Sequence, residues 1–446
     1  MDESTTCTLA YCLAVYEKPE LMADFLENWS SFYVECGIDI YFYDSSVSDA
    51  LEQVYRNWPR KEHIYYLRFP NGTRKIFRMY KGLDFSKKYD FVWLASDGLR
   101  TPKAGLLQIL AHLKPDIDYL IIDRYDVEQL GLRVLTDPDQ VFRSCAFITT
   151  MYGSTILNTH TVCADFDWDY YESILRDYPE MLHWIHTYFY FNRMQQLQQV
   201  RVMHMPNSLP EAVLLRISDK KGSSTWTWSK SFWDACRAWI TMLNLLPDSY
   251  HSKLEASRNL GDCDLLPNEK MLYQHRRWGI YDLQTYWSAR KALRMLSSIP
   301  QITFFRVAVT PRAWLVLRHS RHMKKCLKRI DQLSRSCKCL MIYGAGVHGA
   351  VYGKYFEKHQ IPYEAFCVSR RRPGKETYCD HPVVAFSELG ARIGEIGFII
   401  GLSKASTRQV LPALLEKADK SHIFLDPEFT AGIGEELGYR LVTNLF

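Results

Sequence analysis

Tyr89-Asp90-Phe91-Val92-Trp93-Leu94-Ala95-Ser96-Asp97-Gly98 is the stretch from which the fold prediction starts. An apolar, β-favouring run ends here in a serine, an aspartate and a glycine, which is typical of a buried strand that runs into a loop. The same arrangement occurs upstream, where residues 38–43 run into Asp44-Ser45-Ser46. Two such strands, each followed by a helical pattern, indicate a parallel sheet that binds ligands at the carboxyl ends of its strands.

The same pattern extends over the first 125 residues. Strand-like runs also cover residues 8–16, 63–69 and 118–123. Helix-like runs lie between the strands, over residues 21–33, up to residue 58, over 74–85, and after Thr101-Pro102, where a proline suits the first helical turn. Strands that alternate with helices predict an α/β fold, in which helices cover both faces of a mostly parallel sheet.

Length and composition bound the number of domains and the class of partner. The chain has 446 residues, more than the roughly 250–300 at which one hydrophobic core stops growing, so more than one domain is expected. The net charge of +5 is small for this length, so no nucleic-acid partner is expected. The 12 cysteines form no pair of CxxC motifs, no apolar run approaches the ~20 residues of a membrane span, and the N-terminus has no signal-peptide pattern. These features indicate a cytoplasmic protein with reduced thiols.

Asp44 and Asp97 follow two of the expected strands, and their carboxylates suit two parts of a nucleotide. A carboxylate at the end of the second strand can accept hydrogen bonds from a base or a ribose. A carboxylate at the end of the fourth can hold Mn²⁺ or Mg²⁺, which would bridge two phosphates and neutralise a departing diphosphate. Either aspartate alone also fits a helix N-cap or a turn, but their paired placement favours ligand binding.

Three motifs resemble those of the GT-A glycosyltransferases, particularly the family 2 enzymes of bacterial surface-polysaccharide pathways. Leu13-Ala14-Val15-Tyr16-Glu17-Lys18 resembles the family's first-strand motif, Tyr43-Asp44-Ser45-Ser46 its second-strand motif, and residues 89–98 the strand before its metal-binding Asp-x-Asp. The chain departs from the family in having one carboxylate in Ala95-Ser96-Asp97 and one in the second motif. A metal would therefore take its other ligands from phosphate oxygens and water. The resemblance covers residues 6–125 well and 126–300 loosely.

The resemblance implies a metal-dependent enzyme with a nucleotide-sugar donor and a glycan or lipid-linked acceptor. It assigns donor binding to eight residues, with the last of them as the metal ligand: Ala14, Tyr16, Glu17, Asp44, Ser46, Arg78, Ser96 and Asp97. Arg74, Arg78 and Lys81 are spaced to share one helix face, and Arg78 is expected to face the donor diphosphate. A solvated charged face is the alternative.

Transfer to an acceptor hydroxyl also needs a general base if the anomeric centre is inverted. Asp165 and Asp167 lie beside aromatic residues after the metal motif, and are the candidates for this catalytic role. The Glu-Asp base motif that is usual in the family is absent, and a solvated loop is the alternative for both residues.

The expected domain organisation follows from these patterns. Residues 1–300 are expected to form a GT-A-like domain, with a nucleotide-binding core at 6–125 and a helical, tryptophan-rich acceptor-side region at 150–300. Residues 301–335 are expected to form a basic linker, because an apolar run at 304–317 precedes basic residues at 318–325. Such a segment suits peripheral contact with the inner face of a membrane, and a solvated helix packed between domains is the alternative. A small Rossmann-like α/β domain is expected over 336–446.

The C-terminal domain carries Gly344-Ala345-Gly346-Val347-His348-Gly349 between a strand pattern and a helix pattern. This GxGxxG arrangement predicts a nucleotide whose pyrophosphate lies at the helix N-terminus, with Gly344, Gly346, His348 and Gly349 as its binding residues. The motif also resembles the nucleotide-sugar-binding N-domain of bacterial sugar acyltransferases. Ser369-Arg370-Arg371 replaces the acidic residue that would bind a ribose, so a domain that only packs or oligomerises is the alternative.

Three other functions are weighed against glycosyl transfer. An NAD(P)-dependent oxidoreductase or a nucleotide-sugar-modifying enzyme would act through the GxGxxG domain. A nucleotidyltransferase would share the N-terminal architecture, but it needs a glycine-rich basic loop where Tyr16-Glu17-Lys18-Pro19 stands. A non-catalytic scaffold would not require Asp44 and Asp97. The sequence identifies neither the sugar, the base and the acceptor nor the oligomeric state.

Overall fold

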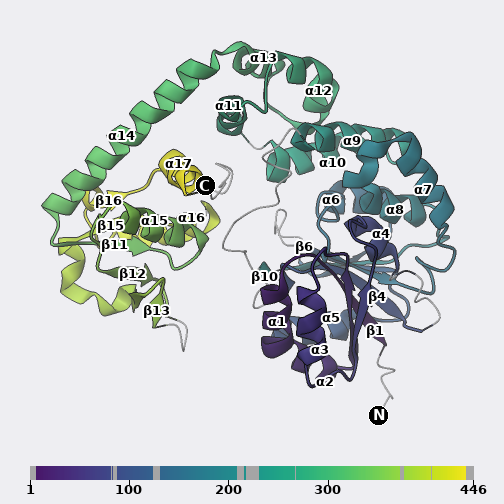
Figure 1. The fold of residues 1–446 in the computed structure, drawn as a ribbon. Helices are drawn as coiled ribbons and strands as arrows, with labels where there is room; N and C mark the ends of the chain where they lie inside the picture. Colours follow the sequence, from purple (N-terminus) through teal and green to yellow (C-terminus); the bar gives the residue numbers. More distant parts are fainter. Residues whose placement is uncertain are drawn as a thin grey trace. The chain divides into compact units, whose positions relative to one another are not determined.

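The structure is a computed structural model that describes residues 7–81, 83, 88–123, 131–207, 215–216, 231–266, 268–371, 376–402 and 404–437. It contains an eight-stranded sheet and, later in the chain, a six-stranded sheet, both accompanied by helices (Figure 1). The α/β class predicted from the sequence is confirmed. Within the described parts of the chain, no helix has both the length and the apolar composition needed to cross a membrane.

The larger sheet has the strand order β3-β2-β1-β4-β8-β6-β9-β7. Its strands are β1 (Leu9–Val15), β2 (Ile38–Asp44), β3 (Ile64–Arg68), β4 (Phe91–Ser96), β6 (Tyr119–Asp123), β7 (Arg133–Leu135), β8 (Thr155–Asn158) and β9 (Val202–Pro206). β1 pairs in parallel with β2 and β4, and β2 with β3, whereas β8 is antiparallel to both β4 and β6. β4 and β6 therefore run in the same direction, and their carboxyl ends lie at the same edge.

One face of this sheet is covered by early helices that share its core. These helices are α1 (Pro19–Asn28), α2 (Ser30–Glu35), α3 (Ala50–Asn57) and α5 (Lys103–His112). Every residue of β1 is buried, and its alternate residues Leu9 to Val15 pack with Phe25 of α1 and Leu106 of α5. The apolar spacing over 21–33 predicts one helix, but the structure has two, because Trp29 adopts φ −129° and ends the first.

Helices dominate the region from residue 138 to residue 296. They are α6 (Pro138–Cys145), α7 (Trp168–Asp177), α8 (Ile185–Met194), α9 (Ser231–Leu245), α10 (Lys253–Leu260), α11 (Glu269–Trp278) and α12 (Leu283–Leu296). The region expected as helical also supplies β8 and β9, which pair with β6 and complete the first sheet. These strands have four and five residues, too few for a clear periodic signal in the sequence. The helix expected over 74–85 is α4 (Lys75–Tyr80), and residues 82 and 84–87 lie outside the described residues.

The smaller sheet has the order β13-β14-β12-β11-β15-β16. Its strands are β11 (Cys339–Tyr343), β12 (Ala365–Val368), β13 (Thr377–Tyr378), β14 (His381–Ala385), β15 (Ile396–Ile400) and β16 (Ile423–Phe424). β11 pairs in parallel with β12 and β15, and among the described strands of this sheet only the edge strand β13 is antiparallel to its neighbour. The helices of this part are α13 (Gln301–Val309), α14 (Arg312–Ser336), α15 (Val347–Lys358), α16 (Lys404–Leu415) and α17 (Pro427–Glu436).

The described residues form two compact units. The first comprises those within Met1–Ile217, Trp233–Leu266 and Ala289–Ser298, and the second those within Ser218–Phe232, Pro267–Ser288 and Ile299–Phe446. In the second unit, Cys326, Ile330 and Leu333 of α14 belong to the same core as the strands β11 and β15. The last half of the expected linker thus packs as part of the C-terminal core, and the domain limits at 300 and 335 remain predictions.

Candidate functional site

The predicted donor-binding residues lie at the carboxyl edge of the larger sheet. β1 lies between β2 and β4, and its register pairs Ala14 with both Tyr43 and Ser96. Val15 pairs with Asp44 one residue further along. The chain segments that leave these three strands therefore begin side by side, and they carry Tyr16, Glu17, Ser46 and Asp97. The structure brings the residues of the three motifs together, as expected for the ligand edge of a parallel sheet.

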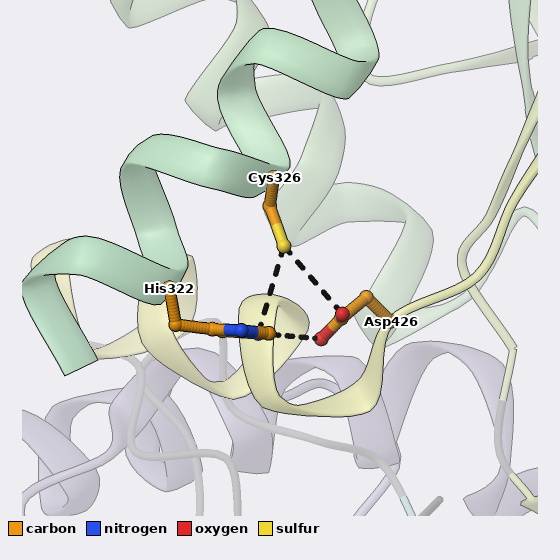
Figure 2. Close-up of side chains that lie close together, drawn as sticks. All are labelled: His322, Cys326 and Asp426. Atoms are coloured by element: carbon orange, nitrogen blue, oxygen red, sulfur yellow. Dashed lines mark hydrogen bonds and ion pairs between the residues drawn. The ribbon is translucent and has the colours of Figure 1, made fainter. Parts of the chain in front are cut away.

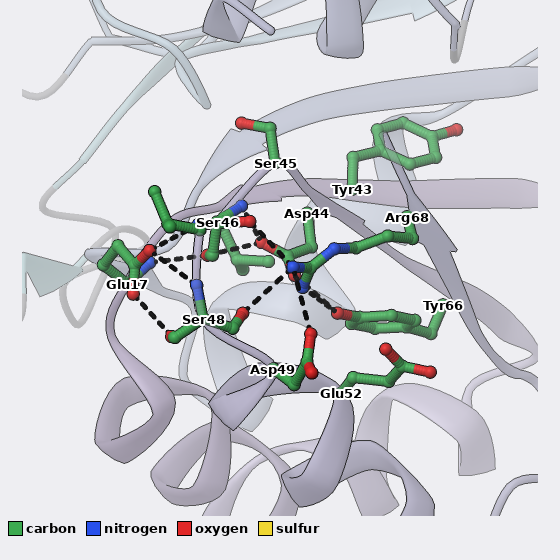
Figure 3. A network of polar contacts seen from close by, with 12 residues as sticks. Glu17, Tyr43, Asp44, Ser45, Ser46, Ser48, Asp49, Glu52, Tyr66 and Arg68 are labelled. Carbon is green, nitrogen blue, oxygen red and sulfur yellow. Dashed lines mark hydrogen bonds and ion pairs between the residues drawn. The ribbon is translucent and has the colours of Figure 1, made fainter. Parts of the chain in front are cut away.

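Asp44 is fully buried and accepts hydrogen bonds on both of its carboxylate oxygens (Figure 3). Oδ1 accepts from the backbone N–H of Ser46 at 2.7 Å and from its hydroxyl at 2.5 Å. Oδ2 accepts from the Tyr66 hydroxyl and from Nη1 of Arg68, both at 2.5 Å. In this conformation Asp44 holds the loop after β2 in place. A contact with a base or a ribose stays a prediction, and requires one of these donors to move.

Glu17 joins the loop after β1 to the loop after β2. It adopts φ +49°, a left-handed conformation that non-glycine residues rarely occupy. Its carboxylate accepts from the N–H of Val47 at 2.5 Å and from the Ser48 hydroxyl at 2.6 Å, and its own N–H donates to Ser46 Oγ at 2.8 Å (Figure 3). Hydrogen bonds from the Ser48 side chain and backbone lower the pKa of Glu17. Tyr16, which precedes it, leaves 44% of its surface exposed and presents an aromatic face at the edge.

Arg78 lies under the ends of β1 and β2 rather than on a solvated helix face. Its exposed fraction is 4%. Nη1 donates to the backbone carbonyl of Val15 and, at 2.8 Å, to that of Tyr43. Burial lowers the pKa of Arg78, and the charges of Asp44 and Asp97 oppose that shift. The prediction that Arg78 faces the ligand edge is consistent with this position, and its role in binding a diphosphate remains a prediction.

Lys75 also lies at this site, although it is not among the predicted donor-binding residues. Its Nζ lies 4.3 Å from the centre of the Tyr152 ring. Burial lowers the pKa of Lys75 to about 8, the charge of Asp97 opposes the shift, and those of Arg78 and Lys18 add to it. The sequence spacing indicates this residue, because Lys75 and Arg78 are three positions apart and therefore share a helix face. The predicted face begins at Arg74, but Arg74 is exposed in the structure.

Lys18, Lys75 and Arg78 place positive charge near Asp97, which bears on the predicted metal site. Lys18 Nζ lies 4.0 Å from Asp97 Oδ2, and Lys75 and Arg78 both interact electrostatically with the same carboxylate. Mg²⁺ at phosphate-binding sites is usually bound through one or two carboxylates, with its other ligands supplied by substrate phosphates and water. Among the described residues, the cluster of His, Cys, Asp or Glu that could hold a metal does not include Asp97. The side chains described here fit an anionic ligand, and do not fit a divalent metal held by the protein alone.

Asp165 and Asp167 lie in a segment that packs against α4. Phe166 and Trp168 contact the ring of Tyr80, with centroid separations of 5.1 and 5.2 Å. Asp167 is the N-cap of α7 and accepts from the N–H of Tyr170 at 3.1 Å. Asp165 is largely exposed and pairs with Arg193 at 3.1 Å. The segment therefore adjoins the helix that carries Lys75 and Arg78, whereas a base role for either aspartate stays a prediction.

A further acidic residue at the same edge is Asp123, the last residue of β6. Its Oδ2 lies 3.4 Å from Nε2 of His204, and both side chains are almost completely buried. His204 comes from β9, the parallel neighbour of β6, and its Nδ1 lies 3.2 Å from the carbonyl oxygen of Gly131. Asp123 has the same sequence pattern as Asp44, because each aspartate ends an apolar strand. Asp123 therefore joins the candidate acid–base residues at this edge.

The glycine motif of the C-terminal unit has the geometry of a tight loop between β11 and α15. Gly344 adopts φ +121°, and a Cβ on Gly349 would lie 1.8 Å from the carbonyl oxygen of Gly344. A Cβ on Gly346, in contrast, would meet no atom within 4 Å, so the space beside this residue is open. Burial lowers the pKa of His348 to about 4. The loop has room for a ligand at Gly346, and binding of a nucleotide there stays a prediction.

Comparison with known proteins gives distant structural likenesses. No model of a protein family matches the chain, and neither does a curated protein. Among solved structures, the chain is similar to the mannosyltransferase PcManGT from Pyrobaculum calidifontis in complex with GDP-Man and Mn²⁺, at 14% identity over 70% of this chain and 86% of that one, with a TM-score of 0.39. It is also similar to residues 1–349 of S. aureus TarS in complex with UDP-GlcNAc, at 13% identity, 65% and 84% coverage and a TM-score of 0.37.

A third similar structure is the galactosyltransferase LgtC in complex with donor and acceptor sugar analogues. Identity is 12%, over 55% of this chain and 99% of that one, and the TM-score is 0.31. At these values the likenesses assign no residue role and no substrate to this chain.

Proposed function

We propose that the first unit is a GT-A-type glycosyltransferase that moves a sugar from a nucleotide-sugar donor to a hydroxyl of a glycan or lipid-linked acceptor. The observation that carries this proposal is the presence of three basic residues near the carboxyl edge of the larger sheet: Lys18 lies 4.0 Å from Asp97, and the charges of Lys75 and Arg78 also interact with that carboxylate. We name these three basic residues the cation cluster. A nucleoside diphosphate is the kind of anionic ligand that binds at this edge of an α/β sheet.

The cation cluster is built to bind a diphosphate without large rearrangement. Arg78 is held by the backbone carbonyls of Val15 and Tyr43, so its position is fixed before a ligand arrives. Lys75 is stacked on Tyr152. Charged donors that are already in place and partly desolvated bind anions more strongly than solvated side chains do. The exposed ring of Tyr16, at the end of β1, supplies a surface on which the base can stack.

The same charges would assist the chemical step. In the transfer, the bond from the anomeric carbon to the diphosphate oxygen breaks, and a bond to the acceptor oxygen forms. Negative charge grows on the departing diphosphate, where the cation cluster stabilises it. In an inverting reaction the proton of the acceptor hydroxyl passes to a carboxylate. Asp165 and Asp167 are the candidates from the sequence, and Asp123 with His204 is the candidate from the structure.

We also propose that the acceptor is reached at a membrane surface, as in the synthesis of bacterial surface polysaccharides. In the second unit, large apolar side chains are exposed on the first half of α12, on α13 and at the start of α14. These are Leu283, Trp287, Ile302, Phe305, Val309, Trp314, Val316 and Leu317. Exposed basic residues follow on α14, and the guanidinium of Arg318 lies 5.5 Å from the ring centre of Trp314. This apolar-basic surface has the composition of helices that lie on anionic lipid, on the cytoplasmic face in this proposal.

A panel of ligands in a thermal-unfolding experiment tests the proposal. UDP-, GDP- and dTDP-sugars would be compared with NAD⁺ and NADP⁺, each with Mn²⁺ and with a chelator. A ligand at ~100 times its dissociation constant stabilises its domain by about 2.7 kcal/mol. A shift with one nucleotide sugar that the variant Lys75→Met loses supports the transferase. A shift with a nicotinamide dinucleotide alone would contradict it, and would transfer the assignment to the loop from Gly344 to Gly349.

A further inference from the structure

Three potential metal ligands converge in the C-terminal unit, where two helices meet. His322 and Cys326 lie one turn apart on α14, and Asp426 is the N-cap of α17 (Figure 2). His322 Nε2 lies 3.1 Å from Asp426 Oδ1, and Cys326 Sγ lies 3.5 Å from His322 Nε2 and 3.5 Å from Asp426 Oδ2. The donor atoms of all three residues fall within 4.8 Å of one another.

These separations match the edges of a tetrahedral zinc site. Zinc binds sulfur at about 2.3 Å and nitrogen or oxygen at about 2.0–2.2 Å, which places neighbouring ligand atoms roughly 3.3–3.7 Å apart. Small side-chain rotations would bring all three donors to these distances. One thiolate, one imidazole and one carboxylate form a donor set that suits Zn²⁺ rather than Mg²⁺ or Ca²⁺. Cys326 is 2% exposed, whereas His322 and Asp426 keep 28% and 17% of their side-chain surface exposed, so a metal can enter and keep a water ligand.

We propose that His322, Cys326 and Asp426 bind one Zn²⁺, which ties α14 to α17. In the metal-free chain the Cys326 thiol donates a hydrogen bond to Asp426 Oδ2 at 3.5 Å. Binding releases the thiol proton to solvent, and the thiolate and the carboxylate then both bind the cation. The metal links residues 100 positions apart in the sequence. None of the three ligands belongs to the cation cluster or to the glycine loop, so this site is independent of the proposed transfer reaction.

The surroundings hold the carboxylate in a suitable position. Asp426 Oδ1 accepts from the N–H of Phe429 at 2.8 Å as the cap of α17. The backbone carbonyl of Asp426 accepts from Thr430 Oγ1 at 3.0 Å, and that hydroxyl is 2.7 Å from Tyr352 OH. Partners beyond the ligands that fix their orientation are typical of metal sites. They also mean that the carboxylate is oriented before any metal binds.

Metal analysis of the full-length protein tests the proposal. The protein would be purified without a metal-affinity step, reconstituted with zinc, passed over a chelating resin and assayed for zinc and for protein. We expect one zinc per chain, and loss of that zinc in Cys326→Ala and in Asp426→Asn. The second variant isolates the metal ligand, because asparagine caps helices as well as aspartate does. The matched control is Asp419→Asn, since Asp419 caps another turn of the same unit by accepting from the N–H of Ser421.

A cobalt-substituted sample gives a readout that a purely structural role would not produce. Co²⁺ bound by a cysteine thiolate absorbs in the near ultraviolet through charge transfer from sulfur, so the wild type should show this band and Cys326→Ser should lack it. Zinc affinity should fall in both ligand variants by more than the roughly 10–100-fold that changes outside the ligand shell cost. Substoichiometric zinc after reconstitution, or full zinc content in folded Cys326→Ala, would overturn the proposal.

Discussion

The guanidinium of Arg78, on α4, donates to the backbone carbonyl of Tyr43, near the end of β2, at 2.8 Å. The same nitrogen also donates to the carbonyl of Val15 at the end of β1. One buried cation thus joins a helix to the ends of two parallel strands, and faces the edge where the sheet would bind its ligand. Folding of this edge and ligand binding at it therefore depend on the same side chain.

Replacing Arg78 by methionine should cost both stability and affinity. The variant keeps most of the side-chain volume but leaves two buried carbonyls without their donor, which should lower the free energy of unfolding by about 1–3 kcal/mol. Loss of a charged hydrogen bond to the diphosphate should weaken nucleoside-diphosphate binding by a similar free energy. Urea unfolding and calorimetric titration measure the two effects. Arg74→Met is the control, because Arg74 precedes the same helix and is exposed, so it should leave both quantities nearly unchanged.

The hydrogen bonds that the Glu17 carboxylate accepts from the loop after β2 should make the free energy of unfolding depend on pH in the acid range. Hydrogen bonds lower the pKa of Glu17 in the folded chain. The ionised Glu17 carboxylate therefore contributes fully to the free energy of unfolding above the pKa that Glu17 has in the unfolded chain. This contribution is lost as the pH falls through the lower pKa that Glu17 has in the folded chain. Urea midpoints of wild type and Glu17→Gln should differ at pH 7 and converge toward pH 3. A constant difference across this range would show that the ionised carboxylate does not hold the loop, and Glu20→Gln is the control on an exposed neighbour.

Two glycine substitutions should separate folding from ligand binding in the C-terminal unit. Valine at position 349 would place its Cβ against the carbonyl of Gly344, so Gly349→Val should strongly lower the melting temperature. A Cβ at position 346 would meet no atom within 4 Å, so Gly346→Val should fold normally. If a nucleotide binds at this loop, Gly346→Val should abolish its binding in a calorimetric titration. Normal nucleotide binding by this variant would show that the loop from Gly344 to Gly349 does not bind the nucleotide.

The apolar-basic surface should bind vesicles that contain anionic lipid. Ile302→Ser and Trp314→Ser each remove a large exposed apolar side chain, and should weaken binding about 10–100-fold, since burial of such a side chain is worth roughly 1.5–3 kcal/mol. Co-sedimentation with phosphatidylglycerol vesicles at low and high salt measures the effect. Leu107→Ser, an equally exposed position in the other unit, should bind as the wild type does. Salt-independent or unchanged binding in all variants would contradict the proposed membrane contact.

The strand ends were predictable from the sequence because their pattern is local. An apolar run that stops at Asp44 or at Ser96-Asp97 shows both the strand and the point where it leaves the sheet. The basic residues over 74–81 indicated a cationic helix, and the structure has α4 there, but the predicted shared face is wrong because Arg78 is buried and Arg74 is exposed. The glycine motif likewise indicated its strand–loop–helix context directly, and the structure has β11, the loop and α15 in that order.

What could not be predicted depends on contacts between distant residues. The antiparallel strand β8 is short, and becomes a strand only through its pairing with β4 and β6. The pair of Asp123 and His204 requires two strands that are far apart in the sequence. The metal-ligand set of His322, Cys326 and Asp426 is invisible along the chain, because α17 folds back onto α14 only in the tertiary structure.

Titration of wild type and Lys75→Met with a nucleoside diphosphate in the presence of EDTA shows whether the cation cluster binds the donor diphosphate. Because the pKa of Lys75 is lowered to about 8, wild-type affinity should also fall between pH 7 and pH 9, whereas the variant should show no such change. Lys61→Met is the matched control, since Lys61 stacks on Tyr55 before β3 begins, at the opposite edge of the sheet.

We expect the wild type and Lys61→Met to bind the diphosphate without a divalent metal, and Lys75→Met to bind about 10–100-fold more weakly, because one charged hydrogen bond is lost. Binding that requires Mn²⁺, or that Lys75→Met retains in full, would contradict the claim that the cation cluster holds the donor diphosphate.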